Sequence, residues 1–230
     1  FALTAAATGL TEEYLRQSGR PYLTSITHPA SNAGYYPGGS QMAIKLLFTK
    51  EGNILGAQVV GAKNVDKCID VLATVIKTGG TVDDLALLEL AYAPLFSSAK
   101  SPANIAGYVA GNIIRGDMKA VSWDQVLDGK NPDFLLLDVR EKREVEAGHL
   151  EGALHIPLND LRKRLHELPK DKEIVVYCQV GLRAYIGTRI LKQNGFKVSN
   201  LSGGWRTIKP ILEDRKATPL PPTVDLVINC

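Results

Sequence analysis

Residues 173–183 read Glu-Ile-Val-Val-Tyr-Cys-Gln-Val-Gly-Leu-Arg, an apolar run that ends in a cysteine and a short loop. Glu173–Tyr177 is short and rich in β-branched residues, which favours a buried strand. Arg183–Asn194 reads as the helix that follows it. A strand followed at once by a helix is half of a βαβ unit. The stretch therefore predicts a parallel sheet with Cys178 at the carboxyl end of one strand, where open α/β sheets place their sites.

Two further apolar stretches repeat this pattern on either side. Phe134–Asp138 reads as a strand upstream, and Lys197–Leu201 reads as a strand downstream. Short apolar strands that alternate with helices are typical of an α/β domain with a parallel sheet. The alternation begins after Arg115-Gly116-Asp117, so we place a domain boundary near residue 118. We predict that the α/β domain covers residues 118–214.

Residues 1–117 follow a different pattern, in which helices and antiparallel strands are mixed. Met42–Thr49 and Ile54–Val60 are separated by four turn-forming residues, which predicts a hairpin. Asn64–Lys77 has apolar residues at helical spacing and stops at Gly79-Gly80. Further elements are expected as follows: a helix starting at Thr11, a strand over Tyr22–Thr27, a helix starting at Thr81, and a helix over Pro102–Ile114. This half therefore predicts an α+β domain.

The composition is that of a soluble globular protein, because 45% of the 230 residues are hydrophobic and 22% are charged. At roughly 150 residues per domain, this length gives between one and two domains. The net charge of +3 is too small and too dispersed to indicate a nucleic-acid partner. No run of about 18 apolar residues occurs, so we expect no membrane-spanning segment.

Three cysteines, Cys68, Cys178 and Cys230, are too few for a disulfide framework in a chain of this length. They fit a reducing compartment, so we expect a cytoplasmic protein in which Cys68 fills a helical core position. The chain opens on Phe1 rather than Met. Residues 215–230 form a Pro-rich tail that reads as a linker to a further, truncated domain. We therefore expect a fragment of a longer protein.

The position of Cys178 between a strand and a helix has a direct chemical use. A short loop there can turn its backbone N–H groups inward at a helix N-terminus, which makes a cradle for an anion. The positive potential favours the thiolate, the reactive form. Gly181 permits the left-handed backbone of a tight loop, and Arg183 would close the cradle by bonding loop carbonyls or an anionic substrate. The alternative is a buried structural cysteine.

Four sequence elements, spread over Ala120 to about Leu212, resemble the rhodanese family. Leu137–Glu141 is similar to its Asp-x-Arg element, and Gly148–Pro157 is similar to its Gly-His-Ile-x-Gly-Ala-x-x-Ile-Pro element. Cys178–Arg183 resembles its Cys-x-x-Gly-x-Arg active loop, and Leu201–Trp205 resembles its Gly-Gly-Trp turn. The four elements occur in the family's order, which makes the resemblance specific.

The resemblance implies sulfur transfer. The thiolate of Cys178 would take up a sulfane sulfur as a persulfide, stabilised by Arg183 and by the cradle residues Gln179, Val180, Gly181 and Leu182. Thiosulfate, polysulfide and coenzyme A or glutathione persulfide are all possible partners. The six-residue loop favours sulfur over phosphate, since the related phosphatases carry one residue more. Ala184 stands where the family often has Ser or Thr, so one possible hydrogen bond to the thiolate is missing.

The other rhodanese-like elements are expected to support the loop. Asp138 and Arg140 would position the fold rather than react. His149 is interpreted as a structural hydrogen-bonding residue, because a thiolate that has already formed needs no general base. Residues 141–144 are all charged, which is typical of a solvated helix face.

The first half resembles the C-terminal dimerisation domain of the flavin-dependent pyridine nucleotide–disulfide oxidoreductases, in particular the coenzyme A-disulfide reductase and NADH oxidase branch. The matching stretches are Phe1–Leu10, Leu55–Gly61, Glu89–Pro94 and Ser101–Gly107. The resemblance implies that Tyr92 with Tyr36 (or Tyr35) would reach the reductase site of a partner subunit. A phenol there can hydrogen-bond a thiolate or donate a proton. Buried aromatic residues of a dimer interface are the equal alternative.

Together the two resemblances describe a flavin disulfide reductase dimerisation domain (residues 1–117) followed by an α/β rhodanese domain with a parallel sheet (residues 118–214). FAD and NAD(P)H are expected for the full-length protein, but the fragment itself would bind neither, and we expect no metal site. A homodimer is implied. The alternative is an inert rhodanese-like docking module attached to a passive dimerisation domain.

Overall fold

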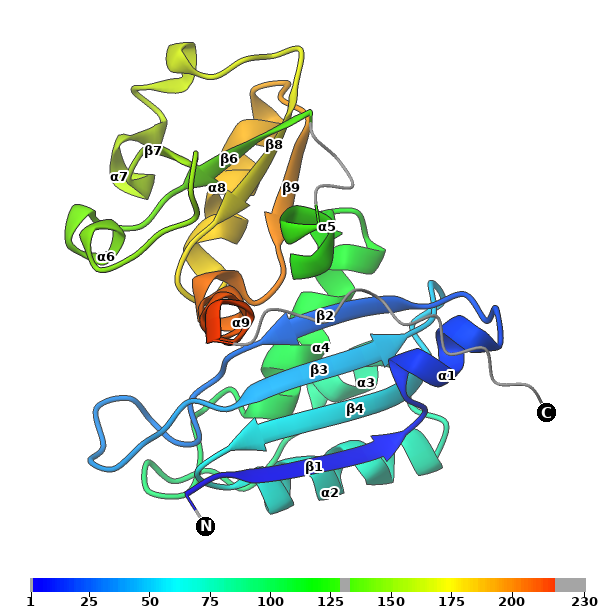
Figure 1. The fold of residues 1–230 in the computed structure, drawn as a ribbon. Coiled ribbons are helices and arrows are strands. Elements are labelled where there is room, and N and C mark those ends of the chain that lie inside the picture. Colours follow the sequence, from blue (N-terminus) through cyan, green and yellow to red (C-terminus); the bar gives the residue numbers. More distant parts are fainter. Residues whose placement is uncertain (1, 129–132, 218–230) are drawn as a thin grey trace.

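The computed structural model describes residues 2–128 and 133–217, and the first domain is built on a four-stranded antiparallel sheet (Figure 1). The strand order is β1-β4-β3-β2. Helix α2 packs on β1 and β4, and helix α4 packs on β2 and β3. The elements are β1 (Thr4–Gly9), α1 (Glu12–Gln17), β2 (Leu23–Thr27), β3 (Ala43–Phe48), β4 (Ile54–Gly61), α2 (Val65–Lys77), α3 (Val82–Leu87) and α4 (Pro102–Ile114).

The hairpin and the helix ends predicted for this domain are confirmed. Strands β3 and β4 pair as the predicted antiparallel hairpin. The Thr11 side chain accepts a hydrogen bond from the backbone N–H of Tyr14, which caps α1. Thr81 begins α3 with a capping box, and Gly79 takes the left-handed conformation (φ +74°) after α2. Each helix therefore begins or ends where the sequence predicts, and its apolar face closes the core against the sheet.

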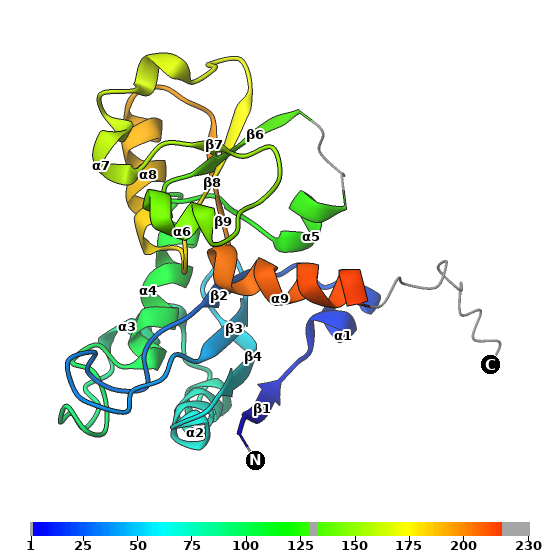
Figure 2. The same cartoon turned by 60° about the vertical axis from the view of Figure 1, so that its left-hand side comes forward.

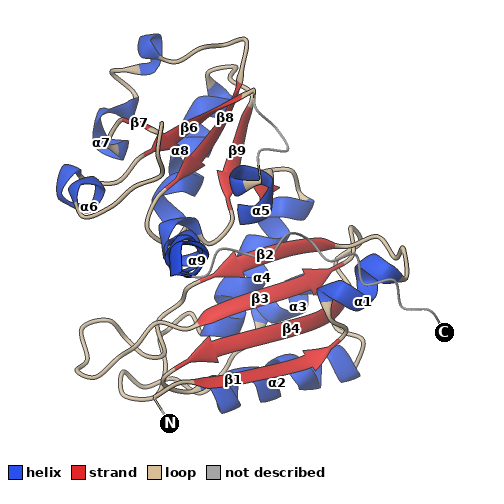
Figure 3. Ribbon diagram, in the orientation of Figure 1, coloured by secondary structure: helices blue, strands red, loops and turns tan. Residues whose placement is uncertain are grey.

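The second domain contains the predicted parallel sheet, whose five strands lie in the order β5-β9-β8-β6-β7 (Figure 3). All of its strand pairs are parallel, and β8 is the central strand. The elements are β5 (Ala120–Val121), α5 (Trp123–Leu127), β6 (Phe134–Asp138), α6 (Lys142–Glu146), β7 (Leu154–His155), α7 (Leu158–Leu161), a 3-10 turn (Leu165–Glu167), β8 (Glu173–Tyr177), α8 (Leu182–Gln193), β9 (Val198–Leu201) and α9 (Gly204–Ala217).

The central strand β8 is buried on both faces. Ile174 and Val176 face a cluster that includes Leu191 of α8. Val175 and Tyr177 face a second cluster with Ile208 of α9. Alternate side chains therefore pack into two cores, which explains why β8 is a continuous apolar run rather than an alternating one.

Helix α9 extends beyond the predicted end of the domain at residue 214. It continues to Ala217, and Arg215 on its last turn donates to Asp128 Oδ1 at 2.8 Å and lies over the ring of Trp123. The first three residues assigned to the tail are thus helical. The rest of the predicted tail, including Cys230, lies outside the described residues. No helix within residues 2–128 and 133–217 is long and apolar enough to cross a membrane.

The two domains meet where the edge strand β2 lies beside the start of α9 (Figure 2). The backbone N–H of Ile26 donates to Ser202 Oγ at 2.8 Å. Nε2 of His28 and Oγ1 of Thr207 share a hydrogen bond of 2.8 Å. Burial lowers the pKa of His28 to about 4, with a smaller contribution from the charge of Arg206. A neutral imidazole is therefore part of the domain contact.

Candidate active site

The active-loop segment, residues 178–183, follows the central strand β8 directly. Cys178 is its first residue and is only 1% exposed. Gly181, with φ at +112°, precedes α8, and its backbone N–H donates to Cys178 Sγ at 3.2 Å. The first four N–H groups of α8 have no partner within the helix, and they lie at the positive end of its dipole. The loop therefore places a sulfur atom where negative charge is stabilised.

The start of α9 holds this loop from the other side. The backbone N–H groups of Trp205 and Arg206 donate to the carbonyl oxygens of Cys178 and Gln179, at 2.8 and 2.9 Å. Gly204 (φ +59°) sits so close that a Cβ there would lie 2.4 Å from the Cys178 oxygen. The second glycine of the Gly-Gly-Trp turn is therefore required by close backbone approach as well as by its conformation.

Asp138 and Arg140 form a buried ion pair at the carboxyl end of β6. Both side chains are 1% exposed, and Arg140 donates to the two carboxylate oxygens at distances from 2.6 to 3.0 Å. The guanidinium carbon lies 5.5 Å from the ring centre of Tyr177 and 5.0 Å from that of Trp205. Burial raises the pKa of Tyr177, which keeps its phenol neutral. Arg140 thus joins the strand before Cys178 to the helix that supports the loop.

The Gly148–Pro157 element wraps around the same arginine. Arg140 donates to the Gly148 carbonyl at 2.8 Å, and the Arg140 carbonyl shares a 2.8 Å hydrogen bond with His155 Nε2. His149 is exposed, and its Nδ1 lies 3.1 Å from the Val145 carbonyl. That geometry gives His149 a local structural contact. Sequence elements far apart in the chain therefore converge on Arg140, which touches no reacting atom.

Arg183 does not bond the loop carbonyls, in contrast to one of the two arrangements considered from the sequence. It forms two hydrogen bonds to the carboxylate of Glu144, at 2.6 and 2.7 Å. This pair lowers the pKa of Glu144 to about 2. Glu144 raises the pKa of Arg183, and Cys178 adds a smaller contribution, so the guanidinium lies near enough to interact with charge on the sulfur.

Glu144 is the site residue that the sequence interpretation missed, because it was assigned to a solvated helix face. Its side chain is only 24% exposed. It also accepts from the Glu141 backbone N–H at 3.0 Å, which completes a capping box at the start of α6. The spacing of Glu141 and Glu144 was a local signal for that box. Nothing local indicated an ion pair with a residue 39 positions away.

The remaining loop residues form the rim of the site. Gln179 and Val180 are half-buried, whereas Leu182 is 67% exposed. Ile186, one turn further along α8, is also an exposed apolar residue. Ala184 is fully buried. As an alanine, it has no hydroxyl that could donate a hydrogen bond to the sulfur. The exposed part of the loop and of the first turns of α8 is therefore apolar at Leu182 and Ile186.

The tyrosines singled out in the first domain lie in exposed segments. The hydroxyl groups of Tyr92 and Tyr35 are 3.1 Å apart, and this hydrogen bond raises the pKa of Tyr92. The structure thus pairs Tyr92 with Tyr35 rather than with Tyr36, whose side chain is 39% exposed. Cys68 is buried in the core of the first domain, and burial raises its pKa to about 12. Within residues 2–128 and 133–217, no cluster of three or more His, Cys, Asp or Glu could hold a metal ion.

Two solved structures are similar to almost the whole chain. The reduced Bacillus anthracis CoADR-RHD has a TM-score of 0.90 and 44% identity, over 94% of this chain and 39% of that one. The NAD-dependent persulfide reductase from A. fulgidus has a TM-score of 0.80 and 41% identity, over 89% of this chain and 37% of that one. The chain therefore spans well under half of either protein.

Two curated relatives match one half each. The coenzyme A disulfide reductase of Staphylococcus epidermidis is 36% identical over 111 residues, which are 48% of this chain and 25% of that protein. A sulfurtransferase of Allochromatium vinosum is 40% identical over 73 residues, which are 31% of this chain and 68% of that protein.

The family models divide the chain in the same way. The model of the rhodanese-like domain matches residues 122–209, where the buried arginine, the active loop and the Gly-Gly-Trp turn lie. The model of the pyridine nucleotide-disulphide oxidoreductase dimerisation domain matches residues 1–103. The chain therefore belongs to the rhodanese-like family through its second half, and its first half is a dimerisation domain of the pyridine nucleotide-disulphide oxidoreductases.

Proposed function

We propose that this chain is the C-terminal part of a reductase for coenzyme A disulfides, persulfides or polysulfides, and that its rhodanese-like domain transfers sulfane sulfur through Cys178. The observation that carries the proposal is the hydrogen bond from the Gly181 N–H to Cys178 Sγ. It places a backbone donor on the sulfur that would attack the donor molecule and would then carry the persulfide.

The first half-reaction is a displacement at sulfur. With thiosulfate as donor, the Cys178 thiolate attacks the outer sulfur, a new S–S bond forms, and the S–S bond of thiosulfate breaks. Sulfite leaves with the electron pair of that bond, so no oxidant or reductant is needed. A thiolate acceptor then attacks the terminal sulfur of the persulfide and restores the Cys178 thiolate.

Arg183 and Glu144 set the charge at the mouth of the cradle. Because Glu144 holds the guanidinium through both of its oxygens, Arg183 is fixed in orientation and its charge is partly compensated. This arrangement still leaves a guanidinium at the mouth of the cradle that an anionic donor such as thiosulfate or a persulfide would meet.

The first domain would serve the reductase half of the same protein. We infer that it forms a homodimer and presents the Tyr35–Tyr92 pair, with Tyr36 nearby in sequence, to the reductase site of a partner subunit. FAD and NAD(P)H would be held by residues outside this chain and would supply the electrons that reduce a persulfide to a thiol and sulfide. The names of the relatives and the dimerisation-domain match support this assignment.

Cyanide-labile sulfur after incubation with thiosulfate or polysulfide tests the transfer step. The wild-type chain should carry one equivalent of sulfur, and Cys178→Ser should carry none. Cys68→Ala is the matched control, because it removes the other described thiol, and it should keep one equivalent. Full transfer by Cys178→Ser would refute the role of this residue.

The burial of Cys178 also favours the second candidate, an inert docking module. The rate of iodoacetamide alkylation distinguishes the two. A working cradle predicts rapid alkylation of Cys178, because the Gly181 N–H contacts its sulfur. An inert module predicts slow alkylation.

A further inference from the structure

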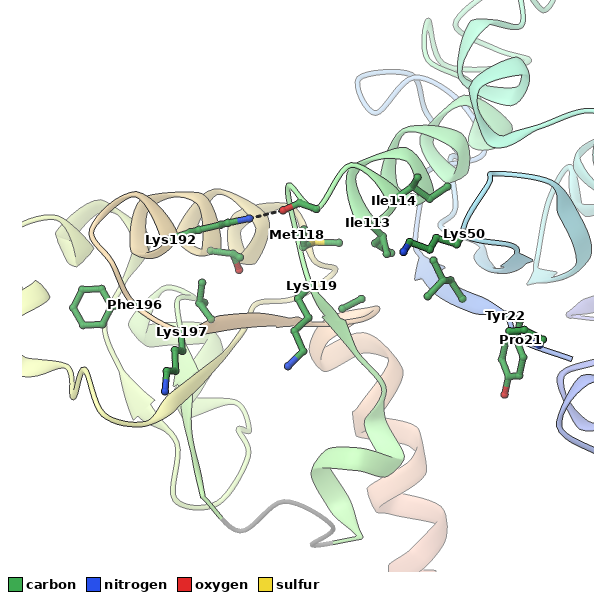
Figure 4. Close-up of a pocket in the computed structure, with 15 residues that line it drawn as sticks. Pro21, Tyr22, Lys50, Ile113, Ile114, Met118, Lys119, Lys192, Phe196 and Lys197 are labelled. Carbon is green, nitrogen blue, oxygen red and sulfur yellow. Dashed lines mark hydrogen bonds between the residues drawn. The ribbon is translucent and has the colours of Figure 1, made fainter. Parts of the chain in front are cut away.

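A cavity of about 700 Å³ lies between the two domains, and none of the active-loop residues 178–183 lines it. Figure 4 shows its lining residues, which come from both halves of the chain. Ile113 and Ile114 belong to the end of α4, and Met118 belongs to the connection into β5. The volume lies within the range of small-molecule sites, roughly 300–1,000 Å³.

The charged residues of the lining are all cationic. They are Lys50 from the first domain and Lys119, Lys192 and Lys197 from the second. Lys119 pairs with Glu173 at 2.8 Å. Lys192 donates to the Gly116 carbonyl, a neutral acceptor that does not compensate the charge of Lys192. Among the residues that the structure describes, no carboxylate lines the cavity. The described part of the cavity wall therefore attracts a negatively charged group.

The rest of the lining is mainly apolar, and it contains one buried polar atom without a partner. Phe196, Val198 and the two isoleucines supply apolar surface. Thr188, on α8, also lines the cavity and is only 1% exposed. Its Oγ1 is buried without a hydrogen-bond partner among the described residues. This oxygen is closed off even from a water-sized molecule, so the apolar side chains and the lysines supply the surface that a bound molecule can reach.

We propose that this cavity binds an organic anion in which a carboxylate or phosphate group is attached to an apolar body. The anionic group would take lysines of the cavity wall as partners. The apolar body would lie against Ile113, Met118 and Phe196. Because Lys50 and Lys197 come from different domains, the ligand would bridge the domains and oppose their separation.

Three probes separate the contributions of charge and apolar surface in the 230-residue chain. Decanoate carries both features, decanol lacks the charge, and inorganic phosphate lacks the apolar body. Isothermal titration calorimetry should show saturable binding of decanoate, with decanol and phosphate each at least about tenfold weaker. Decanoate should also raise the unfolding temperature. Equal binding of decanol or of phosphate, or no saturable binding of decanoate, would overturn the proposal.

Variants locate the site. Lys50→Gln and Lys197→Gln should each weaken decanoate binding by about threefold, whereas Lys216→Gln, an exposed lysine on α9, should not. An effect of Lys216→Gln equal to that of the cavity lysines would mean that decanoate binds elsewhere.

Discussion

Replacement of Gly204 by Ala tests whether the start of α9 holds the active loop in place. A methyl group at this position would lie 2.4 Å from the Cys178 carbonyl oxygen and 3.2 Å from Gln179 backbone atoms. The helix and the loop must therefore move apart by more than half an ångström. That movement lengthens the hydrogen bonds from Trp205 and Arg206, which now measure 2.8 and 2.9 Å.

The free-energy cost has two parts. Alanine in the left-handed conformation costs about 1 kcal/mol, and loss of two backbone hydrogen bonds costs about 1 kcal/mol each, so Gly204→Ala should lose about 3 kcal/mol. Gly195→Ala is the matched control, because Gly195 also has a positive φ (+79°), yet no atom beyond its chain neighbours lies within 4 Å of the position that a Cβ would take. It should lose only about 1 kcal/mol.

Urea denaturation gives the two stabilities, and iodoacetamide alkylation of the native chain reports on the loop. Gly204→Ala should change the alkylation rate of Cys178 by about tenfold. The loop must shift, and this shift disturbs the 3.2 Å hydrogen bond from the Gly181 N–H to the Cys178 sulfur. Gly195→Ala should leave that rate unchanged. If the two variants lose equal stability and react at equal rates, the start of α9 does not support the loop.

Three further predictions concern charges and thiols. Glu144→Gln should slow sulfur transfer in a cyanide assay and cost about 1 kcal/mol at pH 7, after allowance for solvent screening of a partly exposed pair. The folded pKa of Glu144, about 2, lies below its ordinary value of 4.5. The contribution of the wild-type ion pair to the free energy of unfolding is therefore present above pH 4.5 and is lost as the pH falls toward 2. If Glu144→Gln showed the same loss of stability in acid, this reasoning would be contradicted. The pKa of His28 is about 4 in the folded chain, against an ordinary value of 6.5, so the unfolded chain binds the proton first as the pH falls. The free energy of unfolding should therefore drop by at most about 3 kcal/mol between pH 6.5 and 4. Urea titrations should show that His28→Gln abolishes this loss. Burial raises the pKa of Cys68 to about 12, so at pH 8 mass spectrometry should find Cys68 unlabelled in the folded chain and labelled once urea unfolds it; early labelling of Cys68 in the folded chain would count against its burial.

Much of the secondary structure was predictable because its signals are local. The apolar run before Cys178 forms the central strand β8, and Pro102–Ile114 is a helix with both ends where the sequence places them. Capping residues such as Thr81 act within one turn, so their pattern can be recognised without knowledge of the fold. Helix α9 was not predicted, and its last turn, held by contacts with Asp128 and Trp123 rather than by a local signal, includes the first three residues of the predicted tail.

The candidate site was predictable only in part. The position of Cys178 and the need for Gly181 follow from a strand, a short loop and a helix that are adjacent in sequence. The partner of Arg183 was missed, since Glu144 lies on a separate helix and reads as one member of a charged run. The choice of Tyr35 as the partner of Tyr92 likewise depends on how two exposed segments fold back on each other.

The sequence by itself determined the two fold classes, the longer strands and helices, and the identity of the candidate nucleophile. These depend on periodicity and on turn chemistry over a few residues. Only the tertiary structure decided that Arg140 lies between Tyr177 and Trp205, that Ile26 and His28 contact Ser202 and Thr207, and that four lysines line one cavity. Those contacts join residues far apart in the chain, and close packing of the two cores, rather than any local preference, brings them together.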